Sequence, residues 1–219
     1  MTNRRNYFRF VIYLIVLIWF NSVSAGSYDD FFTAIKRDHP NTVEDLLKRG
    51  FDPNTLDEQG QPGVVLALRL ESYAVAGVLV DSPALRLEAS NPAGETALMM
   101  SCLRGQPRLV DRLLKRGAQV NRTGWAPLHY AAAAPDEEAL RLLLDRRPDI
   151  NARSPNGTTA LMMAAQYGTS DSVELLIARG ADVNLRSDLE LTAADFARRA
   201  GRDRTAAAIT RHMRKEATP

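Results

Sequence analysis

Chemically reactive side chains are scarce in this 219-residue sequence, which has one cysteine, Cys102, and three histidines, His39, His129 and His212. A single cysteine cannot form an intramolecular disulfide, so the fold must be stabilised by its apolar core. These four residues are spread along the chain and lack the spacing of metal ligands or of a catalytic triad. We therefore predict that the protein is not an enzyme and has no catalytic residues, no cofactor and no metal site.

An excess of charge of one sign is also lacking, because 28 basic residues stand against 26 acidic ones. Three of the basic residues lie within residues 1–9, and without them 25 basic and 26 acidic residues remain, a formal charge of −1. This balance gives no support to binding of a polyanion. The sequence also lacks a glycine-rich phosphate loop and a stacked aromatic platform. We expect no nucleic acid among the partners.

Only one long apolar run is present, residues 10–20, and it is shorter than the roughly 20 apolar residues that span a bilayer. Three arginines within residues 1–9 precede it, and the small-residue ending SVSA follows at residues 22–25. This three-part form predicts a signal peptide, residues 1–25, cleaved after Ala25, with an uncleaved membrane anchor as the alternative. We expect an exported protein, periplasmic in a bacterium and secreted otherwise, with no membrane contact after cleavage.

The remainder, residues 26–219, is predicted to be one repetitive domain. Residues 94–121 and 157–184 share 14 of 28 residues, mainly glycines, small residues and aliphatics rather than charges. Two aliphatic residues followed by a glycine or its substitute also occur five times along the chain. The glycine positions are Gly50, Pro83, Gly117, Arg147 and Gly180, spaced by 33, 34, 30 and 33 residues. A period near 33 indicates repeated architecture rather than a repeated active site.

A second recurring pattern lies 21 residues before these positions and reads, for example, TALMMS from Thr96 and APLHYA from Ala126. It divides the domain into six units, which begin near Tyr28, Gln61, Glu95, Trp125, Thr158 and Leu191. The third interval is three residues short. This shortening predicts a truncated loop beside Trp125.

Each unit has the pattern of a helix, a turn, a second helix and an extended loop. Thr96 and Thr159 can accept hydrogen bonds from the free amides of a first helical turn. Gly105 and Gly168, nine residues later, suit a left-handed residue that ends a short helix. A second helix with an apolar stripe follows, as at residues 109–114. The second unit starts with proline and glycine and ends in DSPALRLEA, which predicts distorted helices there.

The segment APLHYAAA at residues 126–133, with GAxVN at 117–121 and 180–184, resembles the ankyrin repeat, whose signature is T-P-L-H-x-A at a period of 33. The resemblance covers about residues 28–213, and GxTALMMAA is similar to repeats of small exported bacterial ankyrin proteins. It implies an all-α fold, a solenoid of about six helix–turn–helix units joined by short hairpin loops. It also implies that His129 holds the turns of its own repeat by hydrogen bonds.

Cys102 and the methionine pairs at residues 99–100 and 162–163 could indicate redox or metal chemistry. Cys102 aligns with the small Ala165, which favours a buried and unreactive thiol. Methionine is a flexible packing residue. We interpret these residues as core, and a redox or metal-dependent protein remains a remote alternative.

The concave face of such a solenoid, made of hairpin tips and the outer ends of the first helices, is the surface that a partner can reach. The residues that depart from the repeat there are predicted to bind a partner protein: Arg69, Leu70, Glu95, Leu103, Arg104, Trp125, Asn156, Gln166, Tyr167 and Arg199. Trp125 and Tyr167, flanked by Arg104, suit an interface anchor, because such side chains contribute much interface energy. Packing of Trp125 against the shortened loop is the alternative.

We therefore expect a monomeric, non-catalytic interaction module in an exported compartment. It would bind another protein through the concave face and stabilise or regulate an enzyme there. An immunity or inhibitor protein that neutralises a toxin or enzyme is the alternative. Rigid stacking fixes the binding side chains in advance, so little ordering entropy is lost on binding.

Overall fold

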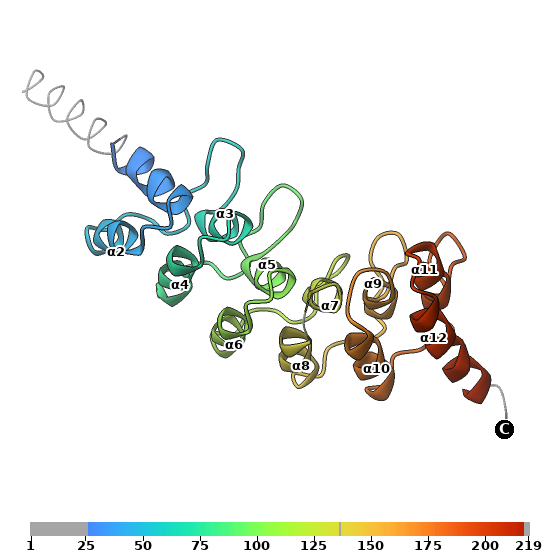
Figure 1. The fold of residues 1–219 in the computed structure, drawn as a ribbon. Helices are drawn as coiled ribbons and strands as arrows, with labels where there is room; N and C mark the ends of the chain where they lie inside the picture. The colour runs from blue at the N-terminus through green and yellow to red at the C-terminus, as the bar shows by residue number, and fades with distance from the viewer. Residues whose placement is uncertain (1–25, 136, 217–219) are drawn as a thin grey trace, which may run out of the picture.

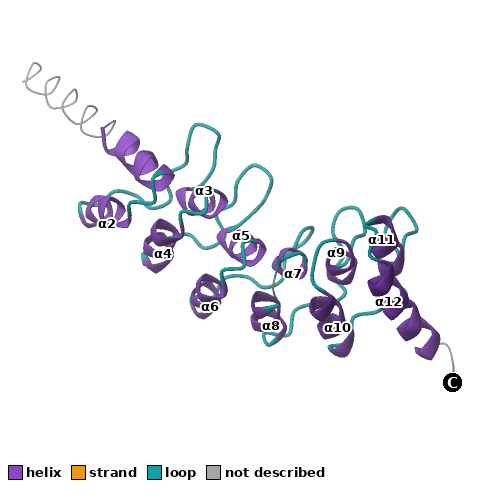
Figure 2. Ribbon diagram, in the orientation of Figure 1, coloured by secondary structure: helices purple, strands orange, loops and turns teal. Residues whose placement is uncertain are grey.

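The structure, a computed structural model, describes residues 26–135 and 137–216, with side chains as far as residue 213. The predicted signal peptide, residues 1–25, lies outside the described residues. Helices alternate with loops along the described chain (Figures 1 and 2). A first helix covers residues 26–36. It is followed by α2 (Pro40–Lys48), α3 (Gly63–Arg69), α4 (Tyr73–Asp81), α5 (Ala97–Leu103), α6 (Pro107–Lys115), α7 (Pro127–Ala132), α8 (Glu138–Leu144), α9 (Ala160–Gln166), α10 (Ser170–Ala178), α11 (Ala193–Arg199) and α12 (Asp203–Glu216).

These helices form six pairs that stack in two layers. Figure 1 shows α3, α5, α7, α9 and α11 in one layer, with the hairpin loops beside it, and α2, α4, α6, α8 and α10 in the other. Successive helices of the first layer contact one another from α3 to α11, and α2, α4, α6 and α8 do so in the second. The predicted all-α solenoid of six helix–turn–helix units is confirmed. None of the described helices is long and apolar enough to cross a membrane.

Threonine side chains start three of the first-layer helices, at Thr192 as well as at the predicted Thr96 and Thr159. Thr96 Oγ1 and Thr159 Oγ1 each accept a hydrogen bond, at 3.4 Å, from the backbone amide three residues later. Gly105 ends α5 with a φ of 57°, the predicted left-handed conformation. The same prediction for Gly168 is wrong, because its φ is not left-handed. A Cβ on Gly168 would press on the carbonyl oxygen of Ala132, so glycine is needed there for close approach of the neighbouring unit.

The second unit is more regular than the sequence predicts. Its helices α3 and α4 have 7 and 9 residues, the same lengths as α5 and α6 in the next unit. Pro62 replaces the usual threonine without distortion because its extended backbone, with φ −60° and ψ 140°, already suits the residue before a helix. The second unit differs from its neighbour in the loop after α4, where the backbone of Ser82 is extended.

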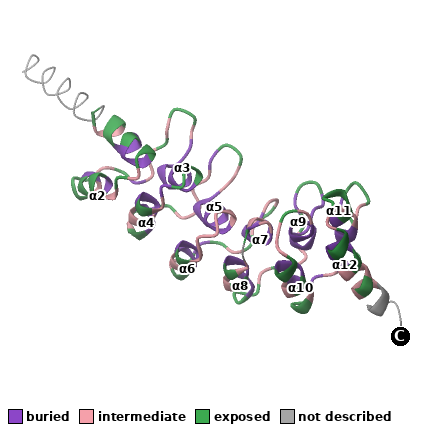
Figure 3. Cartoon of the chain, viewed as in Figure 1, coloured by how far each residue is buried: buried purple, intermediate pink, exposed green. Residues whose placement is uncertain are grey.

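One apolar core runs through all six units (Figure 3). First-layer helices contribute fully buried leucines, among them Leu68, Leu98 and Leu161, and second-layer helices contribute others, such as Leu113 and Leu143. Burying such a side chain stabilises a fold by about 1.5–3 kcal/mol. Because each unit completes the core of its neighbour, the face formed by the loops and first-layer helices is held as one rigid surface.

Candidate partner-binding face

The ten predicted partner-binding residues occupy two kinds of position. Glu95, Trp125 and Asn156 lie in the hairpin loops. The other seven lie at the last residue or the C-cap of a first-layer helix: Arg69 and Leu70 at α3, Leu103 and Arg104 at α5, Gln166 and Tyr167 at α9, and Arg199 at α11. Figure 1 shows the loops and these helices along one side of the molecule. We call this side, the hairpin loops with the C-terminal ends of the first-layer helices, the inner face.

Within the described chain, large apolar side chains are exposed only on the inner face. They are Leu56, Leu70, Tyr167 and Leu189, with exposed fractions of 49%, 48%, 61% and 73%. Leu56 and Leu189 are in hairpin loops, whereas Leu70 and Tyr167 end helices α3 and α9. Apolar side chains exposed together on one face are typical of a binding surface. Leu70 and Tyr167 are among the residues predicted from the sequence, whereas Leu56 and Leu189 are not.

Two of the predicted arginines are engaged within the fold. Arg104 Nη1 lies 3.4 Å from Glu71 Oε1, and Arg104 Nη2 donates a hydrogen bond of 3.1 Å to the backbone carbonyl of Arg69. Arg69 in turn donates to the side chain of Gln61, in the preceding hairpin. The Arg104 contacts join the second unit to the third, and the Arg69 bond lies within the second unit. The Arg104 guanidinium is therefore paired with a carboxylate and helps to shape the inner face, whereas the Arg69 guanidinium is held by the neutral side chain of Gln61.

The carboxylate of Glu95 is engaged in the same way. Glu95 Oε2 accepts a hydrogen bond of 2.7 Å from Asn91 Nδ2, and Oε1 accepts one of 3.4 Å from the hydroxyl of Tyr130 in the next unit. Burial and the adjacent Glu95 carboxylate raise the pKa of Tyr130 to about 12. The phenol therefore remains a hydrogen-bond donor at neutral pH and fixes Glu95 between two units.

Trp125 packs against its own unit. Its ring centroid lies 5.4 Å from that of His129 and 6.5 Å from that of Tyr130, both in edge-to-face geometry. The side chain is only partly exposed. These contacts favour the packing role of Trp125. In the part of the chain that the structure describes, no hydrogen bond, ion pair or ring contact joins Trp125, Tyr167 and Arg104 to one another.

His129 holds the turns around its repeat, as the resemblance implied. The backbone amide of Ala126 donates to His129 Nδ1 at 3.1 Å, so the proton of the neutral ring is assigned to Nε2. Nε2 lies 3.2 Å from the carbonyl oxygen of Ala152 and 3.1 Å from that of Thr158, both in the next hairpin. Burial lowers the pKa of His129. The imidazole therefore serves as a neutral link between units.

The candidate redox residues are in the core, except for Met163, which is only partly buried. Cys102 is fully buried in α5, and burial raises the pKa of its thiol far above the usual range. Such a thiol is not a ready nucleophile. Met99, Met100 and Met162 are also buried. Among residues 26–135 and 137–216, no group of three or more His, Cys, Asp or Glu side chains is placed to hold a metal ion.

A hollow of about 320 Å³ lies between the last two hairpin loops and the ends of α9 and α11. Asn156, Gln166 and Arg199 meet there, together with six residues that were not predicted from the sequence: Thr158, Ser187, Asp188, Leu189, Leu191 and Phe196. We call this feature the terminal hollow. The repeat contained the signal for it, because Leu189 follows Asn156 by one period of 33 residues and therefore occupies the same hairpin position.

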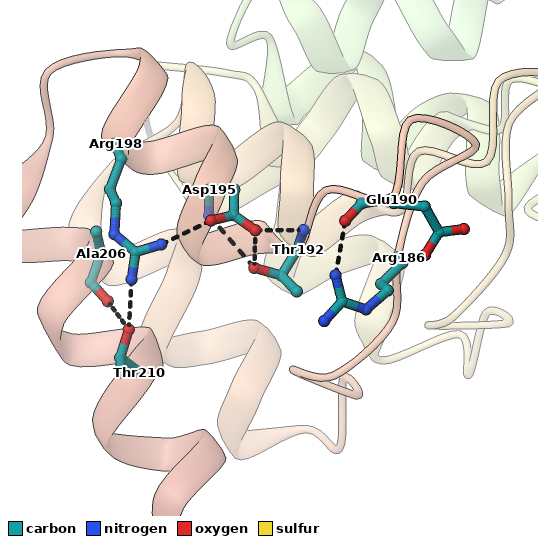
Figure 4. A network of polar contacts seen from close by, with 7 residues as sticks. All are labelled: Arg186, Glu190, Thr192, Asp195, Arg198, Ala206 and Thr210. Atoms are coloured by element: carbon teal, nitrogen blue, oxygen red, sulfur yellow. Dashed lines mark hydrogen bonds and ion pairs between the residues drawn. The ribbon is translucent and has the colours of Figure 1, made fainter.

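A network of hydrogen bonds fixes one wall of the terminal hollow (Figure 4). Asp195 Oδ2 accepts from the backbone amide of Thr192 at 2.9 Å and from its hydroxyl at 2.7 Å. Arg198 donates to Asp195 Oδ1 at 2.6 Å and to the Thr210 hydroxyl at 3.3 Å. The hydrogen bonds from Thr192, with Arg198, lower the pKa of Asp195. This network joins the start of α11 to α12.

Comparison with protein families extends these observations. The family described as ankyrin repeats (3 copies) matches residues 31–123, 67–154 and 121–187. The chain belongs to the ankyrin repeat family. Ankyrin repeats form protein-interaction modules, and the inner face described above is a surface suited to that role.

Curated relatives match this ankyrin chain over only part of their length. The ankyrin repeat and SAM domain-containing protein 6 of Rattus norvegicus is 33% identical over 112 residues, which are 49% of this chain and 13% of that protein. The B-cell lymphoma 3 protein homolog of Mus musculus is 32% identical over 136 residues, 59% of this chain and 30% of that protein. The chain thus spans less than a third of either relative.

A solved structure matches much more completely. It is described as the Bd0816 predatory endopeptidase from Bdellovibrio bacteriovorus in complex with immunity protein Bd3460. A chain of that structure is similar to this ankyrin chain with a TM-score of 0.68 and 28% sequence identity. The match covers 83% of this chain and 97% of the solved one.

Proposed function

We propose that this interaction module binds an enzyme of the peptidase class in an exported compartment and holds it inactive, as an immunity protein does. The observation that carries the proposal is that all four exposed large apolar side chains of the described residues lie on the inner face. Two of them, Tyr167 and Leu189, stand near the C-terminal end of the stack. Removal of such side chains from water by a protein partner lowers the free energy of the complex.

The solved neighbour supports the class of partner. It is a complex of an endopeptidase with an immunity protein, and the similarity extends over 97% of the matched chain. The curated relatives are far longer proteins in which the matching region is a minor part. A rigid chain whose cysteine and central histidine are buried in structural roles can still control an enzyme by covering its surface.

The test is capture of the partner followed by an activity assay. The full chain with a C-terminal affinity tag is expressed in its own cells, recovered from the exported fraction, and the peptidase activity of the complex is compared before and after the partner is released. Higher activity after release is the expected result. Lower activity after release would show a stabiliser instead of an inhibitor, and a recovered partner without peptidase activity would refute the proposed class.

A pair of variants tests the face. We expect the double substitution of Tyr167→Ser and Leu189→Ser to lose the partner, because both side chains lie on the inner face and are exposed. The matched control is Arg108→Gln, on the exposed surface of α6 in the second layer. Full capture by the double variant would show that the partner binds elsewhere.

Export is tested by the same preparation. N-terminal sequencing that begins at Gly26 would support cleavage after Ala25. A chain recovered from the membrane fraction with residues 1–25 intact would support the uncleaved anchor, and a chain found only in the cytoplasm would refute export.

A further inference from the structure

We propose that the terminal hollow binds an apolar side chain of the protein partner together with a side-chain carboxylate next to it on the same partner segment. The inference rests on the proposed function in one respect only, that the inner face binds a protein. It adds the chemistry of one subsite on that face.

The apolar part of the proposal rests on the lining of the hollow. Leu189 is the most exposed of the large apolar side chains, and Leu191 and Phe196 lie beside it in the same lining. The volume of about 320 Å³ is sufficient for one large side chain of a partner. Filling it would remove three apolar side chains from water at once, which is the arrangement found at interface hot spots.

The charge of the hollow comes from Arg199. Two charged residues line it, Asp188 and Arg199. The Asp188 carboxylate is already paired, with its Oδ1 3.4 Å from Arg153 Nη2. The adjacent Arg198 is likewise paired with Asp195. The Arg199 side chain makes no hydrogen bond or ion pair within residues 26–135 and 137–216, so its guanidinium is the charge left to pair with a carboxylate.

A second polar group in the lining lacks a partner. Ser187 is 3% exposed, and its Oγ has no hydrogen-bond partner among the described residues. In the preceding unit, the equivalent Ser154 Oγ donates to Asn156 Oδ1 at 2.6 Å and accepts from the Thr158 amide at 3.0 Å. Leu189 stands in place of Asn156 and offers no acceptor. A carboxylate oxygen that enters the hollow is an acceptor for this hydroxyl.

The other end of the inner face has the opposite charge, which makes the subsite selective. A hollow of about 410 Å³ there is lined by Tyr28, Phe32 and Leu70, by three acidic residues, Asp29, Asp57 and Glu58, and by one basic residue, Lys36, so that acidic groups outnumber basic ones. A carboxylate next to an apolar side chain is repelled from that end and attracted to Arg199. The charge difference therefore favours the C-terminal end of the inner face over the N-terminal end as the place where a carboxylate binds.

The hollow is also held in place before a partner arrives. Arg202, just after α11, donates from Nη1 to the carbonyl oxygens of Ala164 and Ala165 in α9, both at 2.8 Å. These bonds hold the end of α11 against α9, and the network of Thr192, Asp195 and Arg198 shown in Figure 4 holds α11 to α12. Because the walls are rigid, little ordering entropy is lost when the hollow is filled.

The first test uses defined peptides on the full chain. Titrations with acetyl-Gly-Leu-Asp-Gly-amide are followed by NMR shifts of the backbone amides of Leu189 and Phe196 and of the Arg199 side chain. Replacement of Asp by Asn in the peptide should weaken binding by up to about fivefold, the upper limit for an exposed ion pair. Replacement of Leu by Ser should weaken it by about tenfold. Absence of shifts at these positions, or equal binding of the Asn peptide, would overturn the proposal.

A further arm distinguishes the source of the carboxylate. The peptide acetyl-Gly-Gly-Leu with a free C-terminus carries an α-carboxylate next to the same side chain. Tighter binding of this peptide than of the Asp peptide would overturn the assignment to a side-chain carboxylate in favour of a chain terminus.

Variants separate the inference from the proposed function. Arg199→Gln should abolish the preference for Asp over Asn in the peptide while leaving binding of the Asn peptide unchanged, and Arg108→Gln on α6 should alter neither. If the captured partner binds Leu189→Ser and Arg199→Gln as well as it binds the natural chain, the subsite is wrong and the proposed function stands. If no partner is captured, the proposed function fails and the peptide titration still decides the chemistry of the hollow.

Discussion

Replacing Gly168 with alanine tests whether contact between neighbouring units sets the geometry of the inner face. Gly168 follows Tyr167, the C-cap of α9 and the exposed ring of that face. A Cβ on Gly168 would lie 3.0 Å from the Cα of Ala164 and closer still to the carbonyl oxygen of Ala132, at the end of α7. Both neighbours are backbone atoms, which cannot rotate away as a flexible side chain can.

The added methyl group must therefore separate the fourth and fifth units. Overpacking of a well-packed core costs about 1–3 kcal/mol, and the upper part of that range applies where backbone has to move. The smaller conformational entropy of alanine in the unfolded chain offsets about 0.4–1 kcal/mol. We expect the free energy of unfolding to fall by about 1.5–2.5 kcal/mol.

Urea denaturation followed by circular dichroism measures this change, with Gly77→Ala as the matched control. Gly77 lies inside α4, and the nearest atom to a Cβ there is the flexible guanidinium of Arg112 at 3.5 Å. Alanine in a helix interior is more stable than glycine by about 0.5–1 kcal/mol, so this control should gain stability. If Gly168→Ala is as stable as the natural chain, the backbone contact does not set the approach of the two units and the reasoning is refuted.

Two further changes test single residues. Because burial lowers the pKa of His129 below its ordinary value of 6.5, the unfolded chain binds a proton more readily than the folded one below that pH. The contribution of neutral His129 to the free energy of unfolding should therefore be complete above pH 6.5 and should be lost as the pH falls through the folded-state pKa, by at most about 1.4 kcal/mol per pH unit. Urea titrations between pH 7 and 5 would measure this loss. An equal dependence on pH in His129→Gln would contradict the prediction. Glu190 has a left-handed φ of 57° at the hairpin position where Gly60, Gly94, Gly124 and Gly157 stand in the other units. Glu190→Gly should relieve that strain and raise the thermal midpoint, with a gain of about 0.5–1 kcal/mol, and a lower midpoint would show that Glu190 makes a stabilising contact instead.

The fold could be predicted from the sequence because its signals lie within single units. The period, the threonine caps and the apolar stripe each depend on residues close together in the chain. One error, the predicted distortion of the second unit, lies within a unit, and the error at Gly168 concerns a contact between units. Gly168 occupies the place of Gly105 in the repeat, yet it is required by the backbone of Ala132 in another unit. The residues around the two glycines do not show that Gly105 is needed for a left-handed φ and Gly168 for the close approach of another unit.

The candidate site was harder to predict than the fold. A residue that departs from the repeat can either bind a partner protein or form a contact within the fold, and both leave the same mark in the sequence. Arg69, Glu95 and Arg104 depart from the repeat and are used inside, since each bonds to a side chain or carbonyl of the fold. The sequence shows which residues depart from the repeat, but it does not show which groups their side chains contact. Only the arrangement of neighbouring units shows that Arg199, at the end of α11, is different in having no such bond among the described residues.

Leu189 allows the two reasons to be separated by experiment. It exposes an apolar side chain and leaves the Ser187 hydroxyl without the acceptor that Asn156 provides to Ser154, so it lowers stability with no gain inside the chain. Leu189→Asn restores the acceptor, and we expect the free energy of unfolding to rise by about 1 kcal/mol while partner capture falls. Stability from urea denaturation and capture from the exported fraction are measured on the same variant. If both fell together, Leu189 would belong to the core of the fold; if stability rose and capture were unchanged, its exposure would have no function. Opposite changes would place the contribution of Leu189 at the interface.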